Sequence, residues 1–336
     1  MSIKINNFVD VILKHIEPSL NDSSRPITVL LDANATDTGY FSKNGSGEGS
    51  SADEPAKYDE TDNWQKAYFD NGGQILHIVD SLTNLPTNEI IVTYKEDTSV
   101  SDLGEGVDEK IYIMPTTSTT VTNKLNGVVY KKVVEGKEYD IMTVAAYYSK
   151  IRAFNVDDVA DYSFTAETVD EANLIDTNDD AQALGTAHIN YDTYLAGSTR
   201  NIGGDDIEGN DLTNWYMRIV LCQTLSDSLL TLLASKIKYN ATGINAVKNC
   251  VSCELDKYVN SGYIKPTAMW TEDDLYIDKK LWLTKDSPLI SGYSIFISSF
   301  DTLTPDQKKA HQFPNIYIVY SEEYHIRKIV LRGTII

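Results

Sequence analysis

The stretch LTNWYMRIVLCQTLSDSLLTLLASK, residues 212–236, carries the clearest structural signal in this sequence. Apolar residues recur along it at steps of three and four, the spacing of one helix face. The positions of this stripe are Leu212, Trp215, Ile219, Cys222, Leu229 and Leu233. Val220, Leu225, Leu230 and Leu232 widen the stripe, so we expect a long helix that packs against a sheet or between two layers. Arg218 and Asp227 interrupt the apolar run, which argues against a membrane span.

A second helix is expected over residues 243–260, with Gly262 placed to end it. Its narrower apolar stripe consists of Ile244, Val247, Val251, Leu255 and Val259. Cys250 and Cys253 have C-x-x-C spacing but fall inside this helix, away from the helix N-terminus that activates a thiolate. Together with Cys222 they make an odd number of cysteines, so we interpret all three as buried structural thiols.

The segments before residue 212 are rich in short apolar runs bounded by turns, which predict strands. The expected strands are ITVLLDA (27–33), QILHIVD (74–80), NEIIVTYK (88–95), EKIYIMP (109–115), VVYKKVV (128–134) and INYDTYLAG (189–197). YDIMTVAAYYSKI (139–151) is a further candidate for a buried strand, and a short helix is expected near residues 64–69. The polar stretches about residues 95–135 and 165–211 are expected to be rich in loops.

The end of the chain has a βαβ-like pattern. ISGYSIFISSF (290–300) and PNIYIVYSE (314–322) predict strands on either side of Thr304-Pro305-Asp306-Gln307, which combines an N-cap, a proline at N1 and a capping-box glutamine. Strands mixed with helices throughout the chain indicate an α/β (α+β) fold, in which a mixed sheet is packed with helices.

Composition narrows the possible partners. The 336 residues include 29 Lys and Arg against 49 Asp and Glu, a formal net charge of −20. Such a surface disfavours direct binding to nucleic acid, which needs clustered cations, and to anionic membranes. The first 18 residues lack the features of a secretory signal, so we expect the protein to be made and folded in a cytosol.

No catalytic motif stands out in the sequence. Asp176, Asn178 and Asp180 resemble the start of a calcium loop, but Ala181 stands where that loop needs glycine. We therefore interpret this segment as a solvated acidic loop. His77 is interpreted as a packed or edge histidine. The sequence thus predicts no catalytic, cofactor-binding or metal-binding residues, no cofactor and a protein that is not an enzyme.

Both ends of the chain look like strands that lack a nearby partner. Residues 322–336, EEYHIRKIVLRGTII, end on strand-forming residues with no turn behind them, and residues 1–20 form an apolar arm. These strands either pair within their own chain or add to sheets of other chains, and the residues alone leave the two alternatives even. The candidate subunit-linking residues are Ile3, Ile5, Phe8, Val9, Val11, Ile12, Leu13, Ile326, Arg327, Lys328, Ile329, Val330, Leu331, Arg332, Ile335 and Ile336.

The part of the chain from about residue 185 to 336 resembles the contractile tail sheath proteins of tailed bacteriophages and related contractile injection systems. The resemblance consists of an acidic-aromatic helix start, a leucine-rich helix, a Tyr-x-x-x-Gly-Ile turn, a second helix ending Asn-x-Gly-Tyr-Ile, and a late helix motif before the last strands. These features are Asp211 to Trp215, Leu225 to Leu233, Tyr239 to Ile244, Asn260 to Ile264, and Asp306, Lys308, Ala310, His311, Pro314 and Ile316. The likeness before residue 185 is thin.

The resemblance implies a sheath-type core domain, residues 21–325, between an N-terminal linking arm (1–20) and a C-terminal linking strand (326–336). It implies a homo-oligomer of stacked rings or a helical tube, which surrounds a tail tube protein and meets baseplate and tail terminator proteins. Strand addition between neighbours would hold such a sheath together while it contracts to drive the tube through a bacterial envelope. The implied location is a virion tail, assembled in the host cytoplasm, with no direct nucleic-acid contact and no membrane insertion.

Other functions remain open on the sequence. One is a baseplate or tail-completion protein with a sheath-like fold. Another is an acidic surface or carbohydrate-binding module whose tyrosine-rich loops contact a ligand, since the chain contains 21 tyrosines. For the sheath, we hypothesise that Arg327, Lys328 and Arg332 meet acidic neighbours when the terminal strand inserts.

Overall fold

The structure is a computed structural model that describes seven stretches of the chain. They are residues 27–82, 89–95, 110–121, 127–151, 162–235, 237–238 and 240–322. The expected N-terminal arm and C-terminal strand lie outside the described residues, so both stay predictions.

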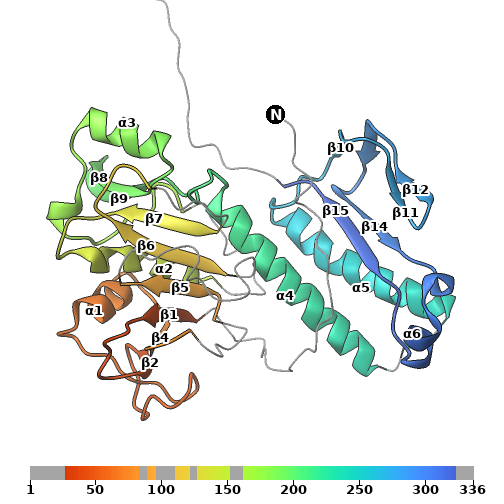
Figure 1. The fold of residues 1–336 in the computed structure, drawn as a ribbon, viewed down its shortest axis with the longest axis horizontal. Coiled ribbons are helices and arrows are strands. Elements are labelled where there is room, and N and C mark those ends of the chain that lie inside the picture. The colour runs from red at the N-terminus through yellow and green to blue at the C-terminus, as the bar shows by residue number, and fades with distance from the viewer. Residues whose placement is uncertain are drawn as a thin grey trace, which may run out of the picture. The chain divides into compact units, whose positions relative to one another are not determined.

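The described elements are runs of strands separated by helices (Figure 1). The strands are β1 (Thr28–Leu31), β2 (Gly39–Ser42), β3 (Ala56–Lys57), β4 (Ile75–Val79), β5 (Ile91–Tyr94), β6 (Ile111–Thr116), β7 (Val128–Lys132), β8 (Tyr191–Leu195), β9 (Ser198–Ile202), β10 (Ala268–Trp270), β11 (Leu275–Ile277), β12 (Lys280–Leu283), β13 (Ser287–Leu289), β14 (Tyr293–Ile297) and β15 (Ile316–Tyr320). The α-helices are α1 (Asn63–Asp70), α2 (Met142–Ser149), α3 (Asn178–Thr186), α4 (Leu212–Ala234), α5 (Ala241–Asn260) and α6 (Pro305–Lys309). The short 3₁₀ helices are η3 (Glu138–Ile141), η5 (Glu171–Asn173) and η6 (Phe300–Thr302).

The described residues form two compact units, and the division falls inside α4. We call residues 27–219 the sheet unit and residues 220–322 the hairpin unit. The expected single core domain, residues 21–325, thus contains two separately packed parts.

The sheet unit is built on a seven-stranded mixed sheet with the order β3-β2-β4-β1-β5-β6-β7. The five strands from β4 to β7 in this order run parallel, while β2 is antiparallel to β4. Sequences such as IVTY in β5 and IYIMPT in β6 are buried at every position, as expected for parallel strands covered on both faces. The predicted mixed sheet packed with helices is therefore confirmed.

Different elements pack on the two faces of the sheet. On one face, α2 packs on β1 and β5, and α1 packs against α2. On the other face, alternate strand residues such as Val92 and Tyr130 form a core with Leu184 of α3, Tyr191 of β8 and Ile207. Because side chains alternate along a strand, neighbouring residues of β7 point to opposite faces of the sheet, one toward α2 and the next toward α3 and β8.

The prediction of a buried strand over residues 139–151 is wrong, because this segment forms η3 and α2. Seven of the eight α2 residues are buried. A helix that is buried on nearly all sides has no polar face, so its sequence lacks the period that distinguishes a helix from a buried strand.

The interpretation of residues 176–186 as an acidic loop is also wrong, since Asn178–Thr186 form α3. The hydroxyl of Thr177 accepts a hydrogen bond from the backbone N–H of Asp180 at 3.2 Å and caps the helix. Asp179 and Asp180 lie in the first turn, where negative charge stabilises the helix dipole. The Thr-x-x-Asp spacing is a helix-start signal that resembles the first half of a calcium loop.

Asp206 fastens the loop before α4 to the start of β7. Its Oδ2 accepts a hydrogen bond from the N–H of Gly127 at 2.9 Å, and its Oδ1 accepts from the N–H groups of Glu208 and Asn210 at 3.0 and 2.8 Å. The side chain is buried, and this burial raises the pKa of Asp206 although the hydrogen bonds act to lower it.

Asp206→Ala is expected to lower the free energy of unfolding by about 2–3 kcal/mol, because three backbone donors lose their acceptor. Asp206→Asn keeps one acceptor and removes the titration. A raised pKa means that the folded state holds the proton more tightly than the unfolded state. Relative to the Asn variant, the wild type should therefore lose stability as pH rises from 3.8 through the folded-state pKa. Urea unfolding of both variants across this range tests the sign, and a pH-independent difference would contradict it.

The hairpin unit combines α5, the rest of α4 and three two-stranded sheets, β10-β13, β11-β12 and β14-β15. Leu283, Leu289 and Val319 form a small core with Trp270 and Trp282 packed against it. Both long helices predicted from the sequence are confirmed. By length and composition α4 could also cross a membrane, a test that buried helices of soluble proteins pass as well.

The end of the chain departs from the expected βαβ pattern. Both strands and the capping box between Thr304 and Gln307 are confirmed, but β14 and β15 run antiparallel. The helix between them, α6, has only five residues, which is too short for the crossover that parallel strands need.

The three cysteines are not buried as predicted: Cys222 and Cys250 are half-buried and Cys253 is exposed. Cys250 and Cys253 do lie within α5, as expected. Burial raises the pKa of the Cys250 thiol, so its surroundings do not activate it.

Candidate functional site

All of the subunit-linking residues predicted from the sequence lie outside the described residues. The structure therefore does not place Ile3 to Leu13 or Ile326 to Ile336. What it does describe is the small sheet that precedes the C-terminal strand in the sequence, made of β14 and β15 (Figure 1).

Both faces of the β14-β15 sheet are in contact with other elements of the hairpin unit. On one face, the hydroxyl of Tyr293 donates a hydrogen bond to Asp256 of α5 at 2.8 Å. On the other face, the indole N–H of Trp282 donates to the Ser294 hydroxyl at 2.9 Å, and the ring of Phe296 lies 5.7 Å from that of Trp282. With its faces occupied, this sheet can grow only along its edges.

The register of the two strands shows which backbone groups point away from β15. Ser321 donates its N–H to the Gly292 carbonyl, and Ser298 donates to the Asn315 carbonyl. In an antiparallel strand, every second residue bonds to the same neighbouring strand. The residues between them, Tyr293, Ile295 and Ile297, therefore point their N–H and C=O groups to the edge of β14 that faces away from β15. Among the described residues no strand pairs with that edge. YSIFI therefore forms a short apolar edge with no charge or proline to block a further strand.

The neighbouring hairpins expose several large apolar side chains. Tyr276 and Leu281 face each other across β11 and β12 and are 58% and 49% exposed. Met269 in β10 and Ile290 are exposed as well. Nothing in the described part of the chain covers these side chains.

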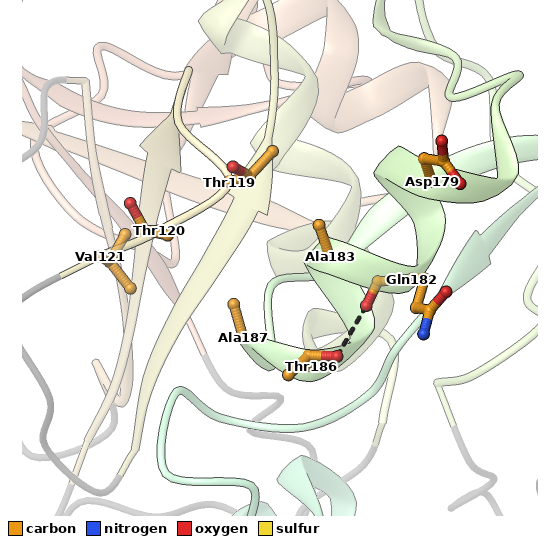
Figure 2. Close-up of a pocket in the computed structure, with 8 residues that line it drawn as sticks. All are labelled: Thr119, Thr120, Val121, Asp179, Gln182, Ala183, Thr186 and Ala187. Atoms are coloured by element: carbon orange, nitrogen blue, oxygen red, sulfur yellow. Dashed lines mark hydrogen bonds between the residues drawn. The ribbon is translucent and has the colours of Figure 1, made fainter.

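The sheet unit contains an open groove of about 670 Å³ between the segment after β6 and helix α3 (Figure 2). Thr119, Thr120 and Val121 form one side, and α3 residues including Asp179, Gln182 and Thr186 form the other. Asp179 is the single ionisable residue among those that line it. The groove lacks a pair of groups that could act as nucleophile and base.

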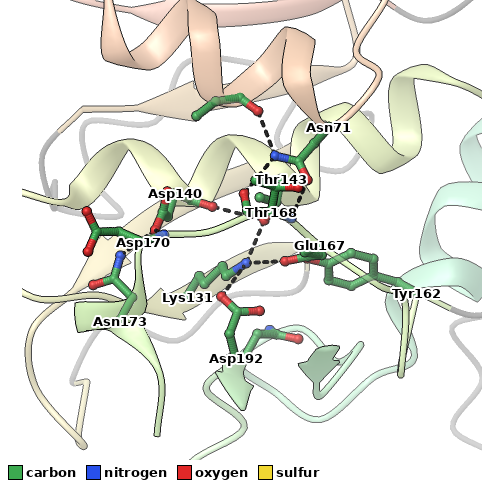
Figure 3. Close-up of polar contacts among 12 residues, drawn as sticks. Asn71, Lys131, Asp140, Thr143, Tyr162, Glu167, Thr168, Asp170, Asn173 and Asp192 are labelled. Atoms are coloured by element: carbon green, nitrogen blue, oxygen red, sulfur yellow. Dashed lines mark hydrogen bonds and ion pairs between the residues drawn. The ribbon is translucent and has the colours of Figure 1, made fainter. Parts of the chain in front are cut away.

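A polar cluster is buried between the sheet and α2 in the sheet unit (Figure 3). The ammonium of Lys131 in β7 lies 2.6 Å from Oε2 of Glu167, 2.9 Å from Oδ2 of Asp192 and 2.5 Å from the Thr143 hydroxyl. The Tyr162 hydroxyl donates a hydrogen bond to the other oxygen of Glu167. The side chains of Lys131 and Asp192 are fully buried and that of Glu167 is 3% exposed. We call Lys131, Glu167 and Asp192 the buried charge cluster.

Two carboxyl groups face one ammonium group in this cluster. Burial raises the pKa of Asp192 well above its usual range, and the repulsion of Glu167 raises it further, against the attraction of Lys131. Burial alone would lower the pKa of Lys131, but the charges of Asp192 and Glu167 outweigh burial and raise it. The buried charge cluster was not predicted from the sequence, although a lysine inside the apolar run VVYKKVV is a signal for it.

A second buried carboxylate lies at the other side of the sheet. Glu89 accepts hydrogen bonds at Oε1 from the Tyr40 hydroxyl at 3.0 Å and pairs with Nδ1 of His77 at 2.7 Å. The rings of Tyr40 and His77 stack 3.9 Å apart. His77 is thus a packed histidine held by a carboxylate, as predicted. Among the described residues no group of three or more His, Cys, Asp or Glu side chains is placed to hold a metal ion.

The fold defined by these two units is that of sheath-type structures from contractile injection systems. No protein-family model and no curated protein sequence matches the chain. Among solved structures, the chain is similar to a chain of the anti-feeding prophage (AFP) baseplate, with a TM-score of 0.59, 12% identity, and coverage of 96% of this chain and 97% of that one.

Two sheath structures are similar to the same extent. The PVC sheath complex of an extracellular contractile injection system, in the contracted state, has a TM-score of 0.62, 14% identity, and coverage of 94% of this chain and 93% of that one. The contracted helical sheath of AFP has a TM-score of 0.58, 11% identity, and coverage of 96% and 98%. At these identities the likeness establishes the fold.

Proposed function

We propose that this protein is a structural subunit of a contractile sheath, which polymerises around a tube and shortens to drive the tube through a bacterial envelope. The observation that carries the proposal is the likeness to two contracted sheaths over more than nine tenths of this chain and of theirs. The sequence resemblance between residues 185 and 336 supports it independently.

We propose further that neighbouring subunits are joined by strand addition at the outer edge of β14. That edge presents the backbone groups of Tyr293, Ile295 and Ile297, and both faces of the sheet are already in contact with other elements. The added strands would be the C-terminal segment 326–336 and the N-terminal arm of other copies. Each backbone hydrogen bond adds only about 0.5–1.5 kcal/mol, but several links per subunit act together in a lattice.

A baseplate subunit with the same fold is the second candidate. It is favoured by the likeness to a chain of the AFP baseplate, which covers as much of both chains as the sheath matches do. The two candidates differ in the assembly they form, since a sheath lengthens into a tube and a baseplate closes as a plate of limited size. Both use the chain as a structural part.

Electron microscopy of the purified full-length protein, alone and with its tube protein, tests the proposal. Long ordered tubes are expected of a sheath subunit, and plates or single rings support the baseplate candidate. A protein that stays monomeric at high concentration, with and without the tube protein, would refute both.

Ile295→Pro tests the edge of β14, because proline removes one outward N–H and leaves the hydrogen bonds to β15 in place. We expect a folded monomer that no longer assembles, and the same result from deletion of residues 326–336. Ile295→Ala is the matched control: it removes more of the side chain but keeps the N–H, so it should still assemble. Tubes formed by a folded Ile295→Pro variant would show that neighbours do not join at this edge.

A further inference from the structure

The buried charge cluster brings together three groups that the proposed assembly role does not use. Lys131 lies in β7 and pairs with Asn190, two residues before Asp192, so Lys131 and Asp192 project from adjacent strands toward α2. Glu167 comes from a segment that pairs with β9, the partner of β8. Strand β7, strand β8 and the segment that pairs with β9 thus hold one amine and two carboxyl groups in a buried site.

The two carboxyl groups have different surroundings. Glu167 accepts a hydrogen bond from the Tyr162 hydroxyl at one oxygen and contacts the Lys131 ammonium with the other. Asp192 has both oxygens buried, and among the described residues only the Lys131 ammonium contacts them as a donor. Two carboxyl groups in unlike environments take different protonation states, the better solvated or hydrogen-bonded one being the anion.

Asp192 has fewer hydrogen-bond donors than Glu167, and burial and the charge of Glu167 raise its pKa well above its usual range, which favours the neutral acid at this position. A neutral carboxylic acid is open to attack by an amine at its carbon, whereas a carboxylate anion repels the attacking electron pair. Lys131 reaches that carbon: Nζ is 2.9 Å from Oδ2, and Cγ is one C–O bond further, which places Nζ within about 4 Å of Cγ.

We propose that Lys131 and Asp192 join in an intramolecular amide bond, with Glu167 as the base that starts the reaction. Oε2 of Glu167, 2.6 Å from Nζ, takes a proton from the Lys131 ammonium and frees the nitrogen electron pair. The nitrogen then bonds to Cγ of Asp192. Glu167 passes a proton from the nitrogen to one oxygen of Asp192, the C–O bond breaks, and one water molecule leaves.

The step balances without an oxidant or an activating group. An ammonium, a carboxylic acid and a carboxylate become an amide, a water and a carboxylic acid on Glu167, and the net charge stays zero. The product also contains no charged group in this buried site, and burial of an uncompensated charge is costly. The resulting cross-link would fasten β7 to β8 within the sheet unit.

The mass of the intact, full-length protein tests this inference. We expect it to be about 18 Da below the mass of the sequence, the loss of one water that an amine attack on a carboxylic acid requires. Tryptic digestion should give a branched peptide in which Lys131 is joined to Asp192, with no cleavage after Lys131. A folded wild-type protein with the full mass of its sequence, cleaved normally after Lys131, would overturn the proposal.

Three variants distinguish the proposed amide bond from a loss of water elsewhere in the protein. Lys131→Arg keeps the positive charge but has no such nucleophile, and Glu167→Gln keeps the shape but has no base, so both should have the full mass of their sequences. Asp192→Asn should lose one ammonia, about 17 Da, if the nitrogen still attacks Cγ. A mass loss of one water that persists in Lys131→Arg would place the dehydration elsewhere and also refute the proposal.

Discussion

Replacing Lys131 by methionine is expected to lower the free energy of unfolding by about 3–5 kcal/mol, the usual loss when one partner of a buried ion pair is removed. Methionine fills nearly the same volume, so the loss comes from charge. It leaves Glu167 and Asp192 facing each other, at 3% and 0% side-chain exposure, with no cation between them. In the cross-linked protein proposed above, the loss comes instead from the missing amide bond between β7 and β8.

The pH dependence of the Lys131→Met variant has a definite sign. Without the lysine, the folded state lacks the cation that compensates negative charge in this buried site, so protonation of the carboxyl groups relieves the cost of an unpaired buried charge. The destabilisation should therefore be largest above neutral pH and should shrink as pH falls toward the carboxyl pKa values of the unfolded state. Urea unfolding at several pH values measures it. Adding Glu167→Gln and Asp192→Asn to the variant should restore part of the stability at neutral pH.

Lys132→Met is the matched control for this variant. Lys132 is the next residue of β7, and its ammonium donates to the backbone carbonyls of Thr117 and Val133. Its removal leaves no buried charge, so the loss should be about 1 kcal/mol or less. Equal effects of the two substitutions would show that the buried charge cluster does not stabilise the fold as described.

Gly292→Ala is expected to destabilise the hairpin unit by about 2–5 kcal/mol, the sum of a left-handed backbone strain and an overpacking cost. Gly292 has φ of 76°, and an added Cβ would lie 2.0 Å from the carbonyl oxygen of Lys265. That oxygen belongs to the backbone and cannot rotate away. The neighbouring hydrogen bonds from Ser321 to Gly292 and from Lys265 to Ser321 would be displaced with it.

Gly262→Ala separates the two costs. Gly262 also has a positive φ, 80°, but nothing lies within 4 Å of its added Cβ. Only the backbone strain remains there, about 1–2 kcal/mol. Amide hydrogen exchange in β14 and β15 measures the effect within the hairpin unit, and Gly292→Ala should weaken protection far more than Gly262→Ala. Similar loss of protection in both would show that the contact with Lys265 relaxes freely.

Several elements could be predicted because their signal is local. The stripe of residues 212–236, the turn at Gly262 and the capping box at Thr304 each combine a period or a terminus with short-range chemistry, and all three agree with the structure. The parallel strands could be located as continuous apolar runs. Their order in the sheet could not, because strand order depends on contacts between segments far apart in the sequence.

The errors have separate physical causes. The α2 segment is buried on nearly every side, so its sequence has no polar face that would mark it as a helix. At α3 the capping signal of Thr177 and Asp180 lies in a segment whose acidic residues also resemble the start of a calcium loop, so the sequence pattern fits both structures. The cysteines of α5 were expected inside because cysteine is usually buried, but Cys253 lies on the outward face.

The sequence by itself determined the fold class, the two long helices, most strands of the parallel sheet and the apolar character of β14. It did so because propensity, capping and periodicity act over a few residues. Only the tertiary structure decided that β14 presents an outward edge with both faces in contact, and that Lys131, Glu167 and Asp192 meet away from water. Edges and buried charges arise from the pairing of distant segments, and a charged residue in the sequence does not reveal whether a partner will reach it.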